Sequence, residues 1–184
     1  RRFGQRAWAG NKRSDVLWTR LARDPSALGR LVVDTPVAAI ARLAAEGRGV
    51  ILAAVHHGPV RVAAMTVRAQ FPETLFLVEE PRLIPGGAHV PSLADEGQRA
   101  AALVEARRHL RAGGLVYLAP DGHAGRHEVR LPVRAGSVAI QRGAATLARL
   151  SGSPALPITA AWTGDGVRVL SGEPITPPRD VAGE

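Results

Sequence analysis

Cysteine is absent from this chain of 184 residues, so neither a disulfide nor a thiolate metal site can form. That absence is compatible with a reducing compartment. Aromatic residues make up only 4% of the chain, and no run of eighteen apolar residues is present to span a bilayer. No signal-peptide pattern is found either. The chain begins at Arg1, and we allow for a fragment whose membrane anchor lies upstream.

Several motifs of nucleophilic, nucleotide and metal chemistry are also missing. The sequence has no Gly-x-Ser-x-Gly elbow, no P-loop and no Gly-x-Gly-x-x-Gly after a strand. Asp121, His123 and His127, together with His56 and His57, supply nitrogen and oxygen atoms of the kind that bind zinc. Because no HExxH motif, paired-cysteine motif or second aspartate cluster accompanies them, we expect no metal.

Positive charge is in excess. The formal net charge is +8, and Lys12 is the sole lysine among 24 basic residues. Hydrophobic residues make up 46% of the chain, which is ordinary for one globular domain. The charge favours an anionic partner, namely a phospholipid surface, a phosphorylated cofactor or a nucleic acid. A solvated arginine-rich surface is the alternative explanation.

The chain divides into two parts. Residues 1–33 form a basic segment with a loose helical pattern that contains Trp8 and Trp18. Such a segment suits a membrane interface, and it equally suits a peripheral helix packed on the domain. Residues 34–184 form the second part, which we expect to be an α/β domain.

Helices and strands alternate along this second part. Helices are predicted at residues 37–44, 59–70, 95–112 and 140–150, and strands at residues 50–55, 74–78, 115–119, 128–133, 155–162 and 167–170. Residues 81–92 are expected to be a loop, 128–133 an edge strand, and the last two strands an antiparallel hairpin. The predicted fold is α/β, with a mixed, mainly parallel central sheet flanked by helices and a C-terminal antiparallel hairpin.

Two polar clusters follow predicted strands, where ligands bind in open α/β sheets. His56, His57 and Gly58 follow one strand, and Pro120-Asp121-Gly122-His123 follows another. A histidine there is suited to act as a general base beside the amides of a helix N-terminus. Alternatively, His57 caps the helix while His56 packs on the sheet.

Four stretches, in this order and spacing, resemble the bacterial lauroyl/myristoyl-type acyltransferases of lipid A biosynthesis, within the lysophospholipid acyltransferase superfamily. They are EGRGVILAAVHHGPV (46–60), LVYLAPDGHAGRHEVRLPV (115–133), GAATLARLSGSPALPITAAW (143–162) and GVRVLSGEPITPP (166–178). The resemblance runs from Asp34 to about Pro178, and it implies an acyltransferase-like α/β fold.

The resemblance also implies a function. A fatty acyl group would pass from acyl-CoA or acyl-carrier protein, as donor substrate, to a hydroxyl of a lipid or glycolipid acceptor. The enzyme would need no further cofactor, and it would lie peripherally on the cytoplasmic face of the bacterial inner membrane. His56 would match the catalytic base of the family's H-x4-D/E motif, and Gly58 the glycine two residues later.

The resemblance also implies roles for other candidate residues in binding the substrates. Asp121 and Gly122 would match the Pro-Asp/Glu-Gly block that shapes the acceptor site, and amides near Gly58 would stabilise the oxyanion. Arg126 and Arg134 flank that block and are expected to bind phosphate.

One position departs from the family pattern: Arg61 stands where the motif has an acid, and counting from His57 places Val62 there. Three explanations stay open. Another acid orients His56, the candidates being Asp121, Glu79 and Glu80. Alternatively, His57 shares the work while Arg61 binds a phosphate, or the domain is a non-catalytic lipid binder.

A rival from another class is a basic nucleic-acid-binding module, which the net charge supports. The few aromatic residues and the lack of a recognition motif argue against it, so we expect no nucleic acid.

Overall fold

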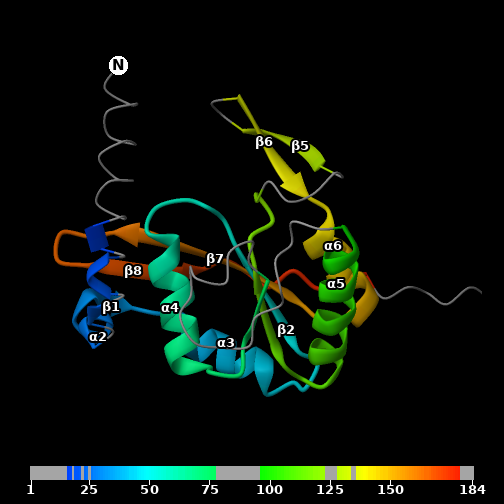
Figure 1. The fold of residues 1–184 in the computed structure, drawn as a ribbon, viewed down its shortest axis with the longest axis horizontal. Coiled ribbons are helices and arrows are strands. Elements are labelled where there is room, and N and C mark those ends of the chain that lie inside the picture. Colours follow the sequence, from blue (N-terminus) through cyan, green and yellow to red (C-terminus); the bar gives the residue numbers. More distant parts are fainter. Residues whose placement is uncertain are drawn as a thin grey trace, which may run out of the picture.

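The computed structural model describes residues 16–17, 19–21, 23–24, 26–77, 96–122, 128–133 and 136–178 (Figure 1). Its main sheet has six strands in the order β1-β8-β7-β2-β4-β3. These strands are β1 (Val32–Asp34), β2 (Val50–Ala54), β3 (Leu75–Leu77), β4 (Leu115–Leu118), β7 (Ala155–Trp162) and β8 (Val167–Ser171). Every neighbouring pair is parallel except β7 and β8. The predicted α/β class, mainly parallel sheet and C-terminal antiparallel hairpin are therefore confirmed.

Helices cover both faces of this sheet. One face packs against α3 (Val37–Ala44) and α4 (Val60–Gln70), and the other against α5 (Glu96–Arg111) and α6 (Gly143–Ser151) (Figure 1). The strands β2, β3 and β4 are almost entirely buried, since apolar residues on both of their faces contact helices. This explains why their sequences are continuous apolar runs with no alternation.

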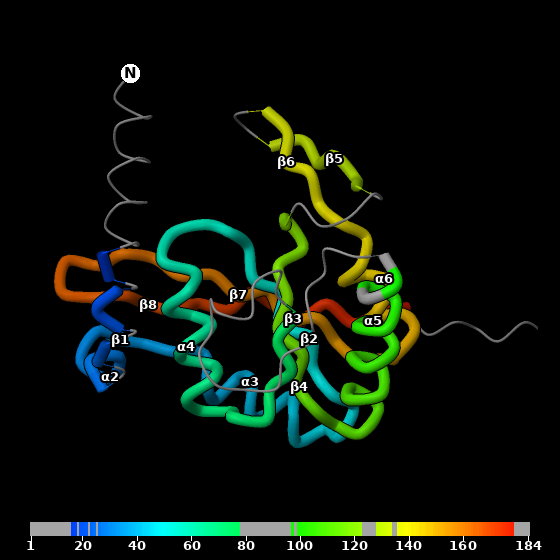
Figure 2. Tube along the Cα trace, viewed as in Figure 1, coloured from blue at the N-terminus to red at the C-terminus, as the bar shows by residue number. Residues whose placement is uncertain are grey.

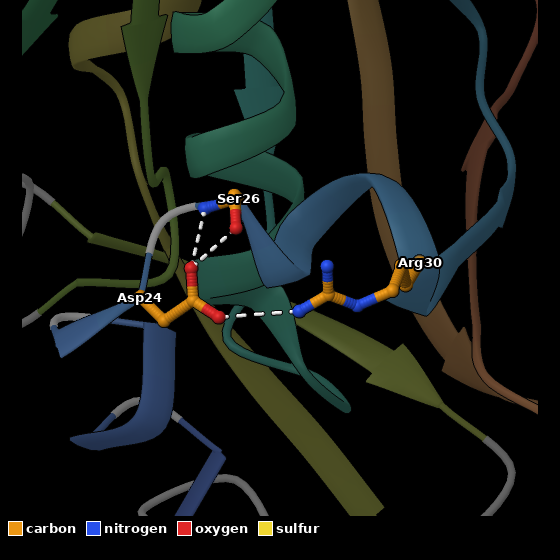
Figure 3. A network of polar contacts seen from close by, with 3 residues as sticks. All are labelled: Asp24, Ser26 and Arg30. Atoms are coloured by element: carbon orange, nitrogen blue, oxygen red, sulfur yellow. Dashed lines mark hydrogen bonds and ion pairs between the residues drawn. The ribbon is translucent and has the colours of Figure 1, made fainter.

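The described residues before residue 32 are largely helical, and Leu21 is buried in the core. Figure 3 shows a polar network around the start of the short helix α2 (Ala27–Leu31). The carboxylate of Asp24 accepts hydrogen bonds from the backbone and hydroxyl of Ser26 and from Arg30 Nη2. The Ser26 hydroxyl and then the Arg30 charge hold the pKa of Asp24 below its usual value. Trp8 and Trp18 lie outside the described residues.

Two strands were missed by the sequence prediction. Residues 32–34 form β1, which spans the predicted boundary at residues 33 and 34 and pairs with β8 in the main sheet. Residues 136–141 form β6, so the helix predicted from residue 140 begins instead at Gly143 as α6. Valine and isoleucine alternate with small or polar residues in β6, and that pattern suits a strand.

The predicted edge strand is confirmed as the strand β5 (Glu128–Val133), and it lies in a two-stranded sheet separate from the main one. Within the described part of the chain β5 pairs with β6 (Gly136–Gln141) alone, and the two strands form a separate antiparallel hairpin. Figure 2 shows this hairpin projecting from the body of the molecule. The loop predicted at residues 81–92 lies outside the described residues. No helix among those described has the length and apolar character needed to cross a membrane.

Candidate functional site

The register of two neighbouring strands brings the two predicted polar clusters together. In the parallel pair of β2 and β4, Ala53 lies opposite Leu118. His56 follows Ala53 by three residues, and Asp121 follows Leu118 by three residues. His56 and Asp121 therefore follow the two strands at equivalent positions, and their side chains meet at the carboxyl edge of the sheet.

Asp121 binds residue 56 through both of its carboxylate oxygens. Oδ2 accepts a hydrogen bond of 2.7 Å from the His56 backbone N–H, and Oδ1 lies 2.9 Å from His56 Nδ1. The Asp121 side chain is 17% exposed and that of His56 is 58% exposed. The Asp121 carboxylate is thus mostly covered by the protein, while the imidazole ring remains open to solvent.

This contact fixes the tautomer of the neutral ring. An ionised carboxylate only accepts hydrogen bonds, so Nδ1 must carry the proton that points at Oδ1. Nε2 then has a free lone pair, and no hydrogen-bond partner for it occurs among the described residues. An oriented carboxylate also stabilises the imidazolium that forms when Nε2 takes up a proton. The pair has the geometry of a general base and its orienting group.

The alternative that His57 caps the helix while His56 packs on the sheet is wrong. His56 is exposed and bonded to Asp121. Helix α4 is preceded by Pro59, and among the residues that the structure describes no side chain caps its N-terminus by a hydrogen bond. His57 is exposed, and its backbone N–H donates to the Val55 carbonyl at 2.7 Å.

Gly58 lies between the paired histidines and α4 in a left-handed conformation, with φ of 60°. A Cβ atom there would fall 2.2 Å from the carbonyl oxygen of Ala160 on β7, so only glycine fits. The neighbouring amides of Val60 and Val62 donate to the carbonyls of Gly58 and Pro59. The Gly58 N–H has no acceptor in the described part of the chain, which leaves it available to a ligand.

The remaining predicted site residues are placed as follows. Arg61 is half-buried in the first turn of α4 and makes polar contacts of its own. Gly122 lies in the turn after β4, where its N–H donates to the Ala119 carbonyl at 3.3 Å. The predicted phosphate ligands Arg126 and Arg134 lie outside the described residues, as do Glu79 and Glu80.

Comparisons with known proteins assign no function to this site. No family model and no curated protein matches this chain. Among the residues that the structure describes, no three His, Asp or Glu side chains gather as a metal site would require. His123 and His127 lie outside the described residues.

One polar residue near the site has no counterpart in the sequence prediction. Tyr117 lies on β4, is only 4% exposed, and packs its ring 5.1 Å from that of Phe76. Its hydroxyl is buried without a hydrogen-bond partner among the described residues. Burial, and next the negative charge of Asp121, raise the pKa of Tyr117 above its usual value. No sequence signal sets this tyrosine apart from an ordinary core residue.

We expect Tyr117→Phe to raise the free energy of unfolding by about 1 kcal/mol, because the change removes a buried hydroxyl that has no partner. The raised pKa of Tyr117 also predicts that the free energy of unfolding depends on pH. It should be unaffected by this group below the usual tyrosine pKa and should fall as pH rises above that value. Denaturant titrations between pH 7 and 11 measure both effects. The chain has a single tyrosine, so tyrosinate absorbance should appear together with unfolding. Titration of the folded protein at the usual pKa would contradict this expectation.

Proposed function

We propose that this chain is an acyltransferase of the lysophospholipid acyltransferase type. It transfers a fatty acyl group from acyl-CoA or acyl-carrier protein to a hydroxyl of a lipid or glycolipid acceptor at a membrane surface. The observation that carries the proposal is the contact between His56 Nδ1 and Asp121, which leaves Nε2 as the basic atom of an exposed ring. A carboxylate at position 121 takes the orienting role that the family motif gives to position 61.

The proposed step is a direct transfer. Nε2 of His56 removes the proton of the acceptor hydroxyl while the hydroxyl oxygen attacks the thioester carbonyl carbon. The tetrahedral intermediate collapses with cleavage of the carbon–sulfur bond, and the imidazolium returns the proton to the departing thiolate. The Gly58 N–H is suited to donate to the oxyanion, since it has no acceptor within the described chain.

An acyl-enzyme route lacks support in the site. Among the described residues, no serine or threonine hydroxyl hydrogen-bonds to either His56 or His57. A nucleophilic side chain next to the base is the usual sign of covalent acyl transfer. The acceptor hydroxyl is therefore proposed as the nucleophile itself.

Acceptor dependence tests this proposal. Purified protein is incubated with a long-chain acyl-CoA, with and without vesicles that contain a hydroxyl-bearing phospholipid or glycolipid, and released thiol and acylated lipid are measured. We expect thiol release to rise at least about tenfold with the acceptor and to match ester formation mole for mole.

Other outcomes, of this assay and of binding measurements with the same vesicles and with random DNA, would contradict the proposal. Thiol release without an acceptor would indicate a thioesterase. No release above the buffer rate, together with binding to vesicles, would indicate a lipid-binding module. Steeply salt-dependent binding to random DNA with no thiol release would support a nucleic-acid-binding protein.

A further inference from the structure

The hairpin of β5 and β6 carries an apolar face that the described chain leaves uncovered. Its two strands pair from Glu128 opposite Gln141 to Val133 opposite Gly136, so alternate residues point to opposite sides. One side, here called the apolar face, consists of Val129, Leu131, Val133, Val138 and Ile140. Four of these five side chains are between 38% and 48% exposed, whereas Ile140, near the end of β6, is partly covered.

The opposite side of the hairpin is polar or small. Arg130 Nη2 lies 3.2 Å from Glu128 Oε1, and the other residues on this side are Pro132, Ser137, Ala139 and Gln141. A two-stranded hairpin with one apolar face is only marginally stable in water by itself. Contiguous exposed apolar side chains on a projecting element mark a surface that another phase or molecule covers.

The hairpin begins directly beside the candidate site. The backbone N–H of Gln141, at the end of β6, donates to the Pro120 carbonyl at 2.6 Å. Asp121, the next residue in that turn, is the one that holds His56. From this attachment the strands project away from the six-stranded sheet (Figures 1 and 2). Whatever covers the apolar face therefore contacts an element that is hydrogen-bonded to the turn holding His56.

Charge decides between the possible occupants. Residues 123–142 contain four arginines, at positions 126, 130, 134 and 142, and one acid, Glu128. The whole chain carries a formal charge of +8, so two copies repel each other while an anionic surface attracts each copy. Apolar side chains flanked by arginines are the combination that binds the interface of an anionic bilayer.

We propose that the β5–β6 hairpin inserts its apolar face into the surface of an anionic phospholipid bilayer and so holds the site at the level of the lipid headgroups. The inference deepens the proposed function and rests on it for the choice of a lipid acceptor. It assigns membrane contact to the hairpin, whereas the sequence offered residues 1–33 as an interfacial segment.

Single labelled cysteines test the insertion, since the chain has no cysteine of its own. An environment-sensitive fluorophore is attached to Leu131→Cys and Val138→Cys on the apolar face, and to Ser137→Cys on the opposite side. Vesicles of phosphatidylglycerol mixed with phosphatidylcholine are then added. We expect emission at positions 131 and 138 to shift to the blue and to rise at least about twofold, with little change at position 137.

Three outcomes would overturn the inference. One is the absence of co-sedimentation with the anionic vesicles. The second is co-sedimentation with no difference between the apolar-face labels and the Ser137→Cys label, which would place the contact elsewhere on the chain. The third is a blue shift without vesicles that grows with protein concentration, which would identify a second copy as the occupant.

A matched pair of variants adds an unlabelled test. Val129→Thr/Val133→Thr/Val138→Thr keeps the branched shape of each side chain but makes the apolar face polar, whereas Pro132→Thr/Ser137→Thr changes the opposite side. We expect the first variant to lose at least about tenfold in vesicle partitioning and the second to lose little. Equal partitioning of the two variants would contradict the proposal.

The two proposals fail in different ways. Labels that report insertion by a protein without acyl transfer would defeat the proposed function alone. Acyl transfer to vesicle lipids with labels that do not respond would defeat the hairpin inference alone. If both hold, the triple threonine variant should lose transfer to vesicle-borne acceptors but keep it with a water-soluble acceptor.

Discussion

The Asp121→Asn variant is expected to lose acyl transfer by roughly 10²- to 10⁴-fold, the range for a general base and its orienting group. The native carboxylate accepts from the His56 backbone N–H and from Nδ1–H at the same time. An asparagine has one oxygen and one NH₂ group. When its oxygen keeps the backbone bond, its NH₂ faces Nδ1, so the ring must carry its proton on Nε2. The base is then in the wrong tautomer.

His56→Ala, which removes the base itself, should lower the rate by a similar factor. The matched control is Asp34→Asn, because Asp34 is an exposed aspartate whose Oδ2 lies 3.5 Å from Arg168 Nε in the pair of β1 and β8, outside the site. The control should retain the native rate within about twofold, since an exposed ion pair contributes little. Thiol release with acceptor, measured beside thermal unfolding, separates lost chemistry from lost fold. Native rates in both site variants would refute the assignment of His56 and Asp121.

Gly58→Ala is expected to lower the free energy of unfolding by about 3 kcal/mol, and with it the activity. Two costs add at this position. The backbone has φ of 60°, which an L side chain rarely adopts, and the new Cβ would lie 2.2 Å from the Ala160 carbonyl oxygen and 3.3 Å from its carbon. The Ala160 contact is with backbone, so relief requires the turn to shift away from β7.

Gly47→Ala provides the control that separates these two costs. Gly47 has φ of 71°, but no atom lies within 4 Å of its Cβ position. That variant should lose only about 1 kcal/mol, the cost of the left-handed backbone. Urea titration of both variants measures the difference. Equal losses would mean that the contact with Ala160 does not constrain the turn after β2.

Sequence alone predicts the layers of this fold well, because buried parallel strands and helix ends leave strong local patterns. Val50–Ala54 is an uninterrupted apolar run, and Gly152 ends α6 in a left-handed conformation. The errors arise where pairing decides the structure. Val32 continues an apolar helical pattern, and its strand exists because β8 lies beside it. β6 exists because β5 folds back on it.

The sequence predicts the residues of the candidate site but not the contact between them. His56 and Asp121 could each be expected at the end of a strand, but their contact depends on β2 and β4 being neighbours, which no local pattern reveals. The motif of the family that the sequence resembles has its acid at position 61, five residues after the histidine, whereas the carboxylate that contacts His56 lies 65 residues away in the chain. The buried hydroxyl of Tyr117 left no signal of any kind.

The most direct test is the tautomer of His56, observed by ¹⁵N NMR of histidine-labelled protein at a pH where the ring is neutral. His56→Gln assigns the signal among the six histidines of the chain. The Asp121 contact predicts a proton on Nδ1 and a bare Nε2 in the native protein, and the reverse in Asp121→Asn. A native His56 that carries its proton on Nε2 would contradict the account, because no base would then face the acceptor.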